Sequence, residues 1–577
     1  MKRYGKYIRP YWYAFILGPL LMLTEVAGEV LLPSFMADII NIGAANHDVG
    51  YIVQKGIIMI LTALIMMAGG VGGAWFASVA AINFGAGLRK DAFKKIQTFS
   101  FSEIDRFSTG SLVTRLTNDI TQVQNLIMMA LRMMLRAPGM LIGAIIMAFL
   151  MNRELAAVFL VILPVMTVAI ILLLRIAYPR FEFMQKKLDA LNSNIQEVLT
   201  NVRVIKSFVR EDYESARFEK SNAELKESSL NAFKIAVAQM PLMMLFMNLT
   251  TLVVVWLGGN QILDGKMQVG DLTAFTTYIV QVLMSLMMLA MVFLQSSRAF
   301  ASGRRINEVM DTQVSLTDDH AAYPEAVVKS GKIEFQNVSF RYYKDSAEKV
   351  LDQINLTIEP GQMIGIIGST GCGKTTLVSM IPRLYDVDEG KVLVDGIDVR
   401  DYSLNHLREG VGMVLQKNVL FSGTIEENLQ WGDENAGKDQ IREAAESAQA
   451  EGFIQKLADG YDTELGQGGV NVSGGQKQRL CIARALLKRP KILILDDSTS
   501  AVDTATEAKI REAFSTTLKE TTKLIIAQRI GSVMEADQIV VMDEGKIVGL
   551  GKHEDLLETC KAYQEIYDSQ MKKEVIA

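Results

Sequence analysis

Six long apolar stretches occupy roughly the first 300 residues of the chain. The apolar core of a bilayer is crossed by a helix of about 20 apolar residues. Four stretches contain no Asp, Glu, Lys or Arg: Gly56–Phe84, Leu155–Leu174, Ile235–Leu263 and Leu272–Ser297. Two others carry a few charges: Tyr11–Ile42 contains Glu25, Glu29 and Asp38, and Leu126–Met151 contains Arg132 and Arg136. The pattern predicts six helices that span a membrane.

Basic residues are distributed unevenly between the connections of these six helices. They are frequent in the N-terminal segment and in two long connections, after the second and the fourth stretch. The other three connections are short and nearly uncharged: Gly43–Gly50, Asn152–Glu154 and Asp264–Asp271. Because Lys and Arg accumulate on the cytosolic side, we expect the N-terminus and both long connections to be cytosolic. Six crossings then return the chain to the cytosol.

The two long connections have mixed charges and few helix breakers, which favours helical extensions of the membrane helices. Each is expected to turn at a short crossing segment, near Phe99–Phe107 and near Val202–Glu211. After about residue 302 the composition changes. Residues 303–331 are polar and mixed and are predicted to be a linker, and from Lys332 short β-type runs alternate with amphipathic helices. The predicted fold is an all-α six-helix transmembrane domain (1–302), a linker (303–331) and an α/β P-loop NTPase domain (332–577).

The composition agrees with a membrane protein and excludes some partners. Half of the residues are apolar, and the mean hydropathy of +0.21 is high for a soluble protein. A net charge of -5 does not favour nucleic acid as a partner. The three cysteines, Cys372, Cys481 and Cys560, are far apart, so neither a disulfide framework nor a zinc site is expected. The first apolar stretch is long and contains glutamates, which favours an uncleaved helix over a signal peptide.

A phosphate-binding motif follows the predicted buried strand Ile364–Ile367 and precedes a helical pattern. It consists of Gly368, Ser369, Thr370, Gly371, Cys372, Gly373, Lys374, Thr375 and Thr376. Glycines let backbone N–H groups converge on phosphate oxygens at a helix N-terminus. Lys374 is expected to reach the β- and γ-phosphates, and the Thr375 hydroxyl to bind Mg²⁺. The strand–loop–helix context favours an ATP site over an ordinary glycine-rich turn.

A second acidic motif lies about 120 residues further along. The apolar run Lys491-Ile-Leu-Ile-Leu ends in Asp496 and Asp497. A buried strand that ends in an aspartate supplies the second half of a P-loop NTPase site, where Asp496 would hold Mg²⁺ through water. Apolar strands that end in an aspartate are common in proteins. Together with the P-loop motif, this one indicates the second half of an ATP site. ATP and Mg²⁺ are therefore the expected cofactors.

Between these motifs lies Asn471-Val-Ser473-Gly474-Gly475-Gln476, which by itself is compatible with a helix cap. In this order and spacing it resembles the signature of ATP-binding cassette (ABC) transporters. The whole chain resembles the exporter class of that family, with six helices ahead of one cassette. The resemblance implies that Tyr342 stacks on adenine and that Gln416 contacts Mg²⁺ and the membrane domain. Further segments match the family in order: Gly110–Asp119, Phe421–Leu429, Thr463–Gly469 and the D-loop Ser500–Asp503.

In this family two cassettes pack head to tail, so that each ATP lies between the P-loop of one chain and the signature of the other. The resemblance therefore implies a second ABC half-transporter chain as the partner. Ser473, Gly474, Gly475 and Gln476 would add N–H donors at a helix N-terminus to the nucleotide on the partner's P-loop. The implied activity is ATP hydrolysis coupled to transport.

Two positions depart from the family pattern, and both belong to the site on this chain's own P-loop. Asp497 stands where active cassettes have a catalytic glutamate, and Gln528 stands where they have a switch histidine. A side chain shorter by one methylene withdraws the carboxylate by about 1.5 Å, and such a misplacement can lower the rate ~10²-fold. Gln528 can donate a hydrogen bond to the γ-phosphate but cannot titrate. The intact signature favours a heterodimer in which hydrolysis occurs mainly at the partner's P-loop; a slow homodimer is the alternative.

The sequence of the membrane half does not identify the transported compound. Two methionine sets follow i, i+3, i+4, i+7 spacing, in Met240–Met247 and in Met284–Met291, which suits an adaptable apolar surface but also ordinary helix or lipid packing. Glu25, Glu29, Arg132 and Arg136 would face a cavity or one another, and the arginines would otherwise lie near the inner surface. We expect export of small amphiphilic or drug-like compounds across a bacterial inner membrane. An ATP-gated channel or a regulatory subunit is the alternative, whereas six apolar spans exclude a soluble P-loop protein.

Overall fold

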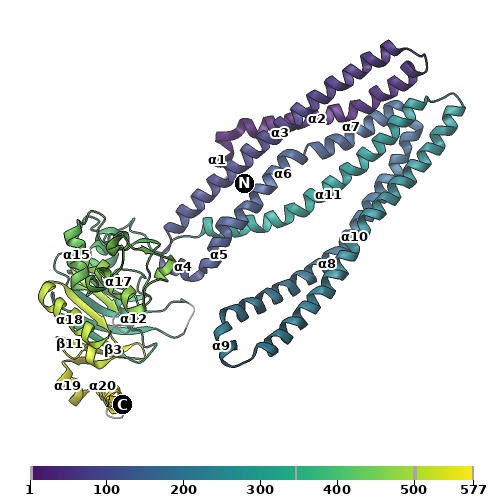
Figure 1. The fold of residues 1–577 in the computed structure, drawn as a ribbon. Helices are drawn as coiled ribbons and strands as arrows, with labels where there is room; N and C mark the ends of the chain where they lie inside the picture. Colours follow the sequence, from purple (N-terminus) through teal and green to yellow (C-terminus); the bar gives the residue numbers. More distant parts are fainter. Residues whose placement is uncertain (1–3, 345–346, 498–502, 575–577) are drawn as a thin grey trace. The chain divides into compact units, whose positions relative to one another are not determined.

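The computed structural model describes residues 4–344, 347–497 and 503–574. The chain divides into two compact units (Figure 1). A membrane unit contains Met1–Ile96 and Gly110–Asp311, and an α/β unit contains Gln97–Thr109 and Thr312–Ala577. The first predicted crossing segment thus belongs to the α/β unit, although it connects two membrane helices.

Six helical segments among the described residues are long and apolar enough to cross a membrane, as the sequence predicts. Several are interrupted by short turns or by π-helical and 3₁₀ segments. The helical elements of this region are α1 (Gly5–Ile8), η2 (Arg9–Tyr11), α2 (Trp12–Asp38), η3 (Ile39–Ala44), α3 (Val49–Gln97), α5 (Thr109–Thr114), η4 (Arg115–Asp119), α6 (Ile120–Met133), α7 (Arg136–Met151), α8 (Arg153–Thr200), α9 (Val202–Ser207), α10 (Glu211–Leu263) and α11 (Val269–Asp311).

Helices α8 and α10 pack along each other as a long hairpin with the short helix α9 at its tip (Figure 1). Helix α9 lies inside the second predicted crossing segment. The apolar side chains beside it are open to solvent: Phe208 is 73% exposed and Val209 is 80% exposed. The hairpin tip therefore presents an apolar surface that its own membrane unit leaves uncovered.

Small residues let helices of the membrane unit approach closely. A Cβ atom at Gly73 of α3 would lie 3.0 Å from the carbonyl oxygen of Gly18 in α2, so only glycine fits there without a shift. Tyr278 of α11 is fully buried and donates its hydroxyl to the carbonyl of Val30 in α2, at 2.9 Å. Helix α11 continues to Asp311, so the first part of the predicted linker is helical.

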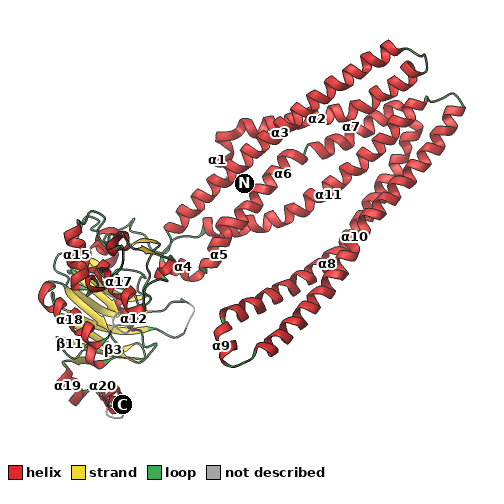
Figure 2. Ribbon diagram, in the orientation of Figure 1, coloured by secondary structure: helices red, strands yellow, loops and turns green. Residues whose placement is uncertain are grey.

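The α/β unit is built on a six-stranded, mainly parallel sheet with the order β12-β11-β3-β10-β9-β6 (Figure 2). Only β12, at one edge, runs antiparallel to its neighbour. A second, antiparallel sheet has the order β2-β1-β4-β5. The strands are β1 (Ile333–Phe340), β2 (Leu351–Ile358), β3 (Met363–Gly368), β4 (Glu389–Val394), β5 (Ile397–Asp398), β6 (Val411–Val414), β7 (Gly423–Thr424), β8 (Glu464–Leu465), β9 (Ile492–Asp496), β10 (Thr522–Ile526), β11 (Gln538–Asp543) and β12 (Lys546–Gly551).

Helices and apolar side chains cover both faces of the six-stranded sheet, which explains why its central strands are continuous apolar runs. Along β9, Leu493 and Leu495 belong to one buried cluster, whereas Ile492 and Ile494 belong to another. The helical elements are α4 (Phe101–Arg106), α12 (Lys374–Ser379), η5 (Val399–Asp401), α13 (Leu404–Glu409), α14 (Ile425–Leu429), α15 (Lys438–Ser447), α16 (Glu451–Ile454), η6 (Gly460–Asp462), η7 (Gln467–Gly469), α17 (Gly474–Leu487), α18 (Thr504–Thr517), η8 (Ile530–Ser532), α19 (His553–Thr559) and α20 (Lys561–Glu574).

The crossing segment around α4 is tied to the α/β unit through a buried carboxylate. Glu103 accepts hydrogen bonds from the backbone N–H of Ser100 at 2.9 Å and of Ser315 at 3.1 Å. Burial alone would raise the pKa of Glu103, but hydrogen bonds from Ser100, Ser315 and Ser102 outweigh it and hold the pKa below its ordinary value. The charged carboxylate thus fixes α4 to the chain that follows α11.

Candidate functional site

Three neighbouring parallel strands place the predicted motifs at one edge of the sheet. Strand β10 pairs in parallel with both β3 and β9, so Ile526 lies level with Ile366 on one side and with Asp496 on the other. The segments that leave the carboxyl ends of β3, β9 and β10 are therefore neighbours. These segments are the P-loop, the acidic pair and the loop containing Gln528, and this edge is where α/β sheets bind ligands.

The P-loop has the backbone that phosphate binding requires. Gly371 and Gly373 have φ of 86° and 98°, in the left-handed region that favours glycine. A Cβ atom at Gly368 would lie 2.1 Å from the carbonyl oxygen of Met542, so that position also needs glycine. Lys374 follows at the start of α12, and its ammonium donates to the carbonyl oxygens of Gly368 at 2.8 Å and Ser369 at 2.7 Å. The lysine therefore already lies over the loop that would hold the phosphates.

Two oxygen ligands for a hard cation meet beside this loop. The Thr375 hydroxyl donates to Oδ1 of Asp496 at 3.0 Å. Burial raises the pKa of Asp496, the Thr375 hydrogen bond lowers it, and the neighbouring Asp497 raises it, for a net upward shift. Hydroxyl and carboxylate oxygens suit Mg²⁺, which binds few protein ligands together with nucleotide phosphates. The Thr375 hydroxyl and the Asp496 carboxylate therefore fit an Mg²⁺ ion bound together with a nucleotide.

Asp497 adopts an unusual backbone conformation and contacts Gln528. Its φ of 49° lies in the left-handed region, which aspartate tolerates better than most residues. The side-chain amide of Gln528 donates to its Oδ2 at 2.7 Å. Burial raises the pKa of the Asp497 carboxyl, while hydrogen bonds from Gln416 and Gln528 lower it, and the pKa stays above its ordinary value. Gln416, Asp497 and Gln528 thus form one hydrogen-bonded group.

Tyr342 lies near the P-loop helix, on the chain that follows β1. Its hydroxyl shares a 2.9 Å hydrogen bond with the hydroxyl of Thr376, and 43% of its surface is exposed. The aromatic ring packs edge-on against Tyr385, with 5.2 Å between ring centroids. An exposed ring held beside the P-loop is compatible with stacking on an adenine base.

The predicted signature begins a helix, as a cap at that position requires. Ser473 and Gln476 form a capping box at the start of α17: the Ser473 N–H donates to Oε1 of Gln476 at 2.8 Å, and the Gln476 N–H donates to Oγ of Ser473 at 3.3 Å. Gly474 and Gly475 form the first turn of the helix. The signature residues thus lie at the N-terminus of α17, where their backbone N–H groups begin the helix.

The structure therefore unites most of the predicted site. Lys374, Thr375 and Asp496 meet at the P-loop, and Thr376 contacts Tyr342. Thr370 lies exposed on the loop, and Cys372 is buried beneath it. Most of the expected D-loop, from 500 to 502, lies outside the described residues.

Three contributors were not predicted from the sequence. Tyr385 packs against Tyr342, Gln478 donates to the carbonyl oxygen of Asp497 at 3.3 Å, and Gln570 contacts the backbone on both sides of Arg529. Each comes from a segment remote from the motif it touches. In the sequence each of them is a single polar or aromatic residue outside any motif, so no pattern indicated its role.

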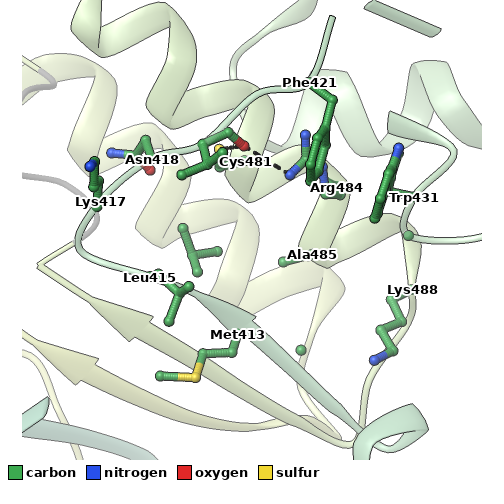
Figure 3. A pocket seen from close by; sticks show the side chains of 14 residues that line it. Met413, Leu415, Lys417, Asn418, Phe421, Trp431, Cys481, Arg484, Ala485 and Lys488 are labelled. Atoms are coloured by element: carbon green, nitrogen blue, oxygen red, sulfur yellow. Dashed lines mark hydrogen bonds between the residues drawn. The ribbon is translucent and has the colours of Figure 1, made fainter. Parts of the chain in front are cut away.

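A pocket of about 310 Å³ opens on the surface beside the Gln416 segment. The rings of Phe421 and Trp431 stack at its mouth, with 4.1 Å between centroids, and the guanidinium of Arg484 lies beside Phe421 (Figure 3). Trp431 is 64% exposed. The lining also includes Met413, Val414, Leu415, Lys417, Asn418, Val419, Cys481, Ala485 and Lys488. The lining thus combines apolar side chains with the basic groups of Lys417, Arg484 and Lys488.

The charges inside the membrane helices face one another. Arg136 of α7 donates to Oε1 of Glu29 at 2.8 Å and lies 3.1 Å from Oε1 of Glu25, both in α2. All three side chains are mostly buried. Arg132 remains exposed. The sequence left open whether these charges face a cavity or one another. In the structure Glu25, Glu29 and Arg136 pair with one another.

The two methionine stripes do not face a single environment. In α10, Met243 is buried and Met247 packs against the same apolar cluster, whereas Met240 and Met244 are exposed. In α11, Met284 and Met291 are exposed, and Met287 and Met288 are half-buried. Part of each stripe therefore serves packing within the membrane unit.

Family models and relatives agree with this architecture. A model described as "ABC transporter transmembrane region" matches residues 15–286, and one described as "ABC transporter" matches residues 351–500. The uncharacterized ABC transporter ATP-binding protein YfiB of Bacillus subtilis (strain 168) is 42% identical over 574 residues, which cover 100% of this chain and 99% of the relative.

Two further comparisons concern proteins whose names describe an activity. The ATP-dependent lipid A-core flippase of Desulfotalea psychrophila is 34% identical over 483 residues, 84% of each chain. The solved structure of a bacterial Atm1-family ABC exporter with ATP bound superposes with a TM-score of 0.78 at 25% identity, covering 98% of both chains. The similarity extends through both units.

Proposed function

We propose, for a chain that belongs to the ABC transporter family as an exporter-type half-transporter, that its own ATP site holds nucleotide and hydrolyses it only slowly. Half-transporters of this type dimerise, and their ATPase is coupled to transport. The observation that carries the proposal is the hydrogen bond between Gln528 and Asp497. The two residues that depart from the family pattern lie together at one site, where they would act on the same ATP.

The roles of the P-loop residues follow from their positions. Backbone N–H groups of Gly371 to Thr375 would bind the β-phosphate, and Lys374 would move from the loop carbonyls to the β- and γ-phosphates. Thr375 and Asp496, with Gln416 nearby, would hold Mg²⁺, which neutralises phosphate charge when bound. Tyr342 would stack on adenine. These residues supply binding and charge neutralisation without an efficient base.

The slow step is the activation of water. Asp497 directly follows Asp496, the expected Mg²⁺ ligand. Its side chain is one methylene shorter than the glutamate that active cassettes have at this position. Its carboxylate already accepts a hydrogen bond from Gln528. A neutral amide can hold a γ-phosphate oxygen but cannot supply positive charge to the transition state. This site is therefore better suited to retaining ATP than to cleaving it.

The signature of this chain would serve a different P-loop. Ser473, Gly474, Gly475 and Gln476 begin α17 with a complete capping box and are intact in sequence. We assign them to the ATP on the partner chain, whose P-loop site would carry glutamate and histidine at the two altered positions. Hydrolysis would then occur mainly at that shared site, and the functional unit would be a heterodimer. A homodimer with slow hydrolysis is the alternative.

The pocket beside Gln416 suits the transmission of movement. Its stacked and exposed Phe421 and Trp431 offer an apolar surface. Helix α9 has exposed apolar neighbours, such as Phe208, that would fill a pocket of this kind on the partner chain. ATP-driven closure of the cassettes would therefore move the long hairpins and open the membrane cavity to the other side.

The cargo that fits the membrane unit best is a small amphiphile. Exposed methionines of α10 and α11 offer an adaptable apolar surface. Pairing with Arg136 neutralises part of the charge of Glu25 and Glu29, which weakens the case for a cationic cargo. The similarity to a lipid A-core flippase supports an amphiphilic class without identifying the compound. Lipid is the expected surrounding of the six spans.

We place the protein in a bacterial inner membrane, with the N-terminus and the α/β unit in the cytosol and export as the direction. The attachment of α4 to the α/β unit supports this orientation, because the connection after the second span then lies on the side where ATP is available. The basic residues of that connection agree with it.

The test is to purify the chain from its native membrane in mild detergent and to identify co-purifying proteins by mass spectrometry. A stoichiometric second ABC half with glutamate and histidine at the altered positions is the expected result. Recovery of this chain paired only with itself would overturn the heterodimer and leave Asp497 as a slow but working base.

A further inference from the structure

The C-terminal helix α20 reaches the backbone of the segment that carries Gln528. The side-chain amide of Gln570 donates through Nε2 to the carbonyl oxygen of Gln528 at 2.8 Å. Its Oε1 accepts from the backbone N–H of Ile530 at 2.9 Å. The two hydrogen bonds lie on either side of Arg529, so a single amide holds the main chain at two points.

Helix α20 is itself firmly placed. Tyr563 is fully buried in the main cluster of the α/β unit, and its hydroxyl shares a 2.7 Å hydrogen bond with Nδ1 of His553 at the start of α19. Ile566 and Tyr567 pack against the same cluster. Gln570 stands two turns beyond Tyr563 on a helix whose rotation is fixed by these contacts. Its side chain therefore has a defined position relative to the sheet.

A second helix holds the same segment from its other end. Arg511 of α18 donates through Nη1 to the carbonyl oxygen of Gly531 at 2.6 Å. The backbone from Gln528 to Gly531 is thus fixed by side chains of two helices, while the Gln528 side chain itself extends to Asp497. Any displacement of this backbone would move the Gln528 amide relative to Asp497.

We propose that Gln570 is a positioning residue for Gln528, so that the C-terminal helix sets how firmly this chain's own site retains ATP. The inference rests on the proposed function, in which Gln528 donates to the γ-phosphate. The glutamine amide offers a neutral donor and a neutral acceptor in one planar group, and its side chain spans the distance from α20 to both backbone groups. Release of α20 would make the backbone from Gln528 to Gly531 more mobile. ATP would then be held less tightly, although the P-loop itself is unchanged.

The experiment uses the assembled transporter purified from its native membrane, photolabelled with 8-azido-ATP and competed with ATP. Labelling of this chain is resolved from that of its partner on a gel. Loss of a hydrogen bond worth about 1 kcal/mol predicts that Gln570→Ala raises the half-displacing ATP concentration about three- to tenfold. Gln570→Glu keeps the acceptor for Ile530 but places a carboxylate against the Gln528 carbonyl, so at least the same shift is expected.

Gln564 provides a matched control on the same helix. Its Nε2 donates to the carbonyl oxygen of Leu557 at 2.5 Å, away from the Gln528 segment. Gln564→Ala therefore removes the same kind of bond and should leave the half-displacing concentration unchanged. An equal shift in Gln564→Ala and Gln570→Ala would overturn the proposal, because the effect would then reflect helix stability alone.

A double variant separates positioning from structure. If Gln570 acts through the Gln528 side chain, Gln570→Ala should add no further shift in a Gln528→Ala background. A shift of the same size in both backgrounds would overturn the proposal. Lys374→Ala tests the underlying site: if it leaves labelling intact, the proposed ATP site fails together with this inference. If it abolishes labelling while Gln570→Ala competes like the parent protein, only the inference fails.

Discussion

The side-chain amide of Gln528 donates a 2.7 Å hydrogen bond to Oδ2 of Asp497, although the two residues are 31 positions apart. Parallel pairing of β9 with β10 places them side by side at the edge of the sheet. The Gln528 amide has a second N–H, which in the proposed function would donate to a γ-phosphate oxygen while the first stays on Asp497. The two residues therefore form one functional pair, and substitutions at them should be made together.

Replacement of both residues by those of active cassettes should create a hydrolytic site. For Asp497→Glu with Gln528→His, we expect vanadate-dependent trapping of nucleotide on this chain to rise ~10²-fold, because the carboxylate regains its reach. Trapping is measured with 8-azido-ATP on the assembled transporter. Asp497→Asn with Gln528→His is the control, since it restores the histidine without a base. Unchanged or lower trapping in the first variant would show that Asp497 and Gln528 are not the cause of slow hydrolysis at this site.

The Arg136 pairing should be essential for the stability of the membrane unit. Arg136→Met removes the shared partner of Glu25 and Glu29, and breaking such a buried group typically costs about 3–5 kcal/mol. The variant should unfold at a clearly lower temperature in detergent. Adding Glu25→Gln and Glu29→Gln should recover most of the loss, because no charge then remains buried.

Arg132 supplies the control for this experiment. It lies four positions before Arg136, near the end of α6, and is exposed. Arg132→Met should change the unfolding temperature little. If the charge-neutral triple variant is as unstable as Arg136→Met, the loss comes from packing and not from unpaired charge.

The hydrogen bond between Tyr385 and Asp105 should couple the crossing segment to the nucleotide site. The Tyr385 hydroxyl donates to Oδ2 of Asp105 at 2.7 Å, and its ring packs against Tyr342. Burial raises the pKa of Tyr385, and the Asp105 carboxylate raises it further, so the hydroxyl stays a donor at physiological pH. Tyr385→Phe removes one hydrogen bond of about 1 kcal/mol, and amphiphile-stimulated ATPase should fall about two- to fivefold while basal ATPase persists.

The exposed Tyr343 is the matched tyrosine for this comparison. Tyr343→Phe should leave both rates as they are. Asp105→Asn should reproduce the effect of Tyr385→Phe, since it weakens the same bond from the other side. A parallel decrease of basal and stimulated rates in Tyr385→Phe would contradict a coupling role.

Asp395 should make the start of the α/β unit sensitive to acid. Its carboxylate accepts from the backbone N–H groups of Lys329, Ser330, Gly331 and Lys332 at 2.6 to 3.0 Å. Burial alone would raise the pKa of Asp395, but these bonds and the Ser330 hydroxyl outweigh it and hold the pKa below its ordinary value. The ionised carboxylate therefore adds stability above pH ~4, and this stability is lost as the pH falls through the lowered pKa.

Asp395→Asn should lower the free energy of unfolding by about 1–3 kcal/mol at neutral pH, because a charged acceptor is replaced by a neutral amide. The difference from the parent protein should shrink as the pH falls below ~4 and through the lowered pKa of Asp395, because the parent's carboxylate is then protonated. Thermal unfolding of the α/β unit as a function of pH measures both. Asp459→Asn, at an exposed position, is the control. A difference that does not depend on pH would contradict the role of ionised Asp395.

Local patterns explain why the membrane spans and the P-loop were predictable. A bilayer imposes a length and a composition on each helix separately, and the six stretches satisfy both. The P-loop is a continuous segment in which Gly371, Gly373 and Lys374 need no distant partner to define the loop. Asp496 was predictable because the end of a buried parallel strand lies at the ligand-binding edge.

Partners far apart in the chain could not be assigned from these patterns. Arg136 pairs with glutamates more than a hundred residues away, and Tyr385 contacts Asp105 across 280 positions. The methionine spacing in α10 predicted one stripe, yet packing buries Met243 and leaves Met240 exposed. Helical spacing predicts which residues lie on the same side of a helix. It does not predict whether that side packs against another helix or stays exposed.

The amino-acid sequence by itself determined the six spans, the α/β fold, the ATP motifs and the two altered positions, because each depends on short-range periodicity or on a continuous motif. Only the tertiary structure decided that Gln528 bonds Asp497, that Arg136 lies between two glutamates and that Gln570 holds the backbone beside Gln528. Such pairs depend on strand order and helix rotation, which arise from the packing of the whole chain and have no local signature in the sequence.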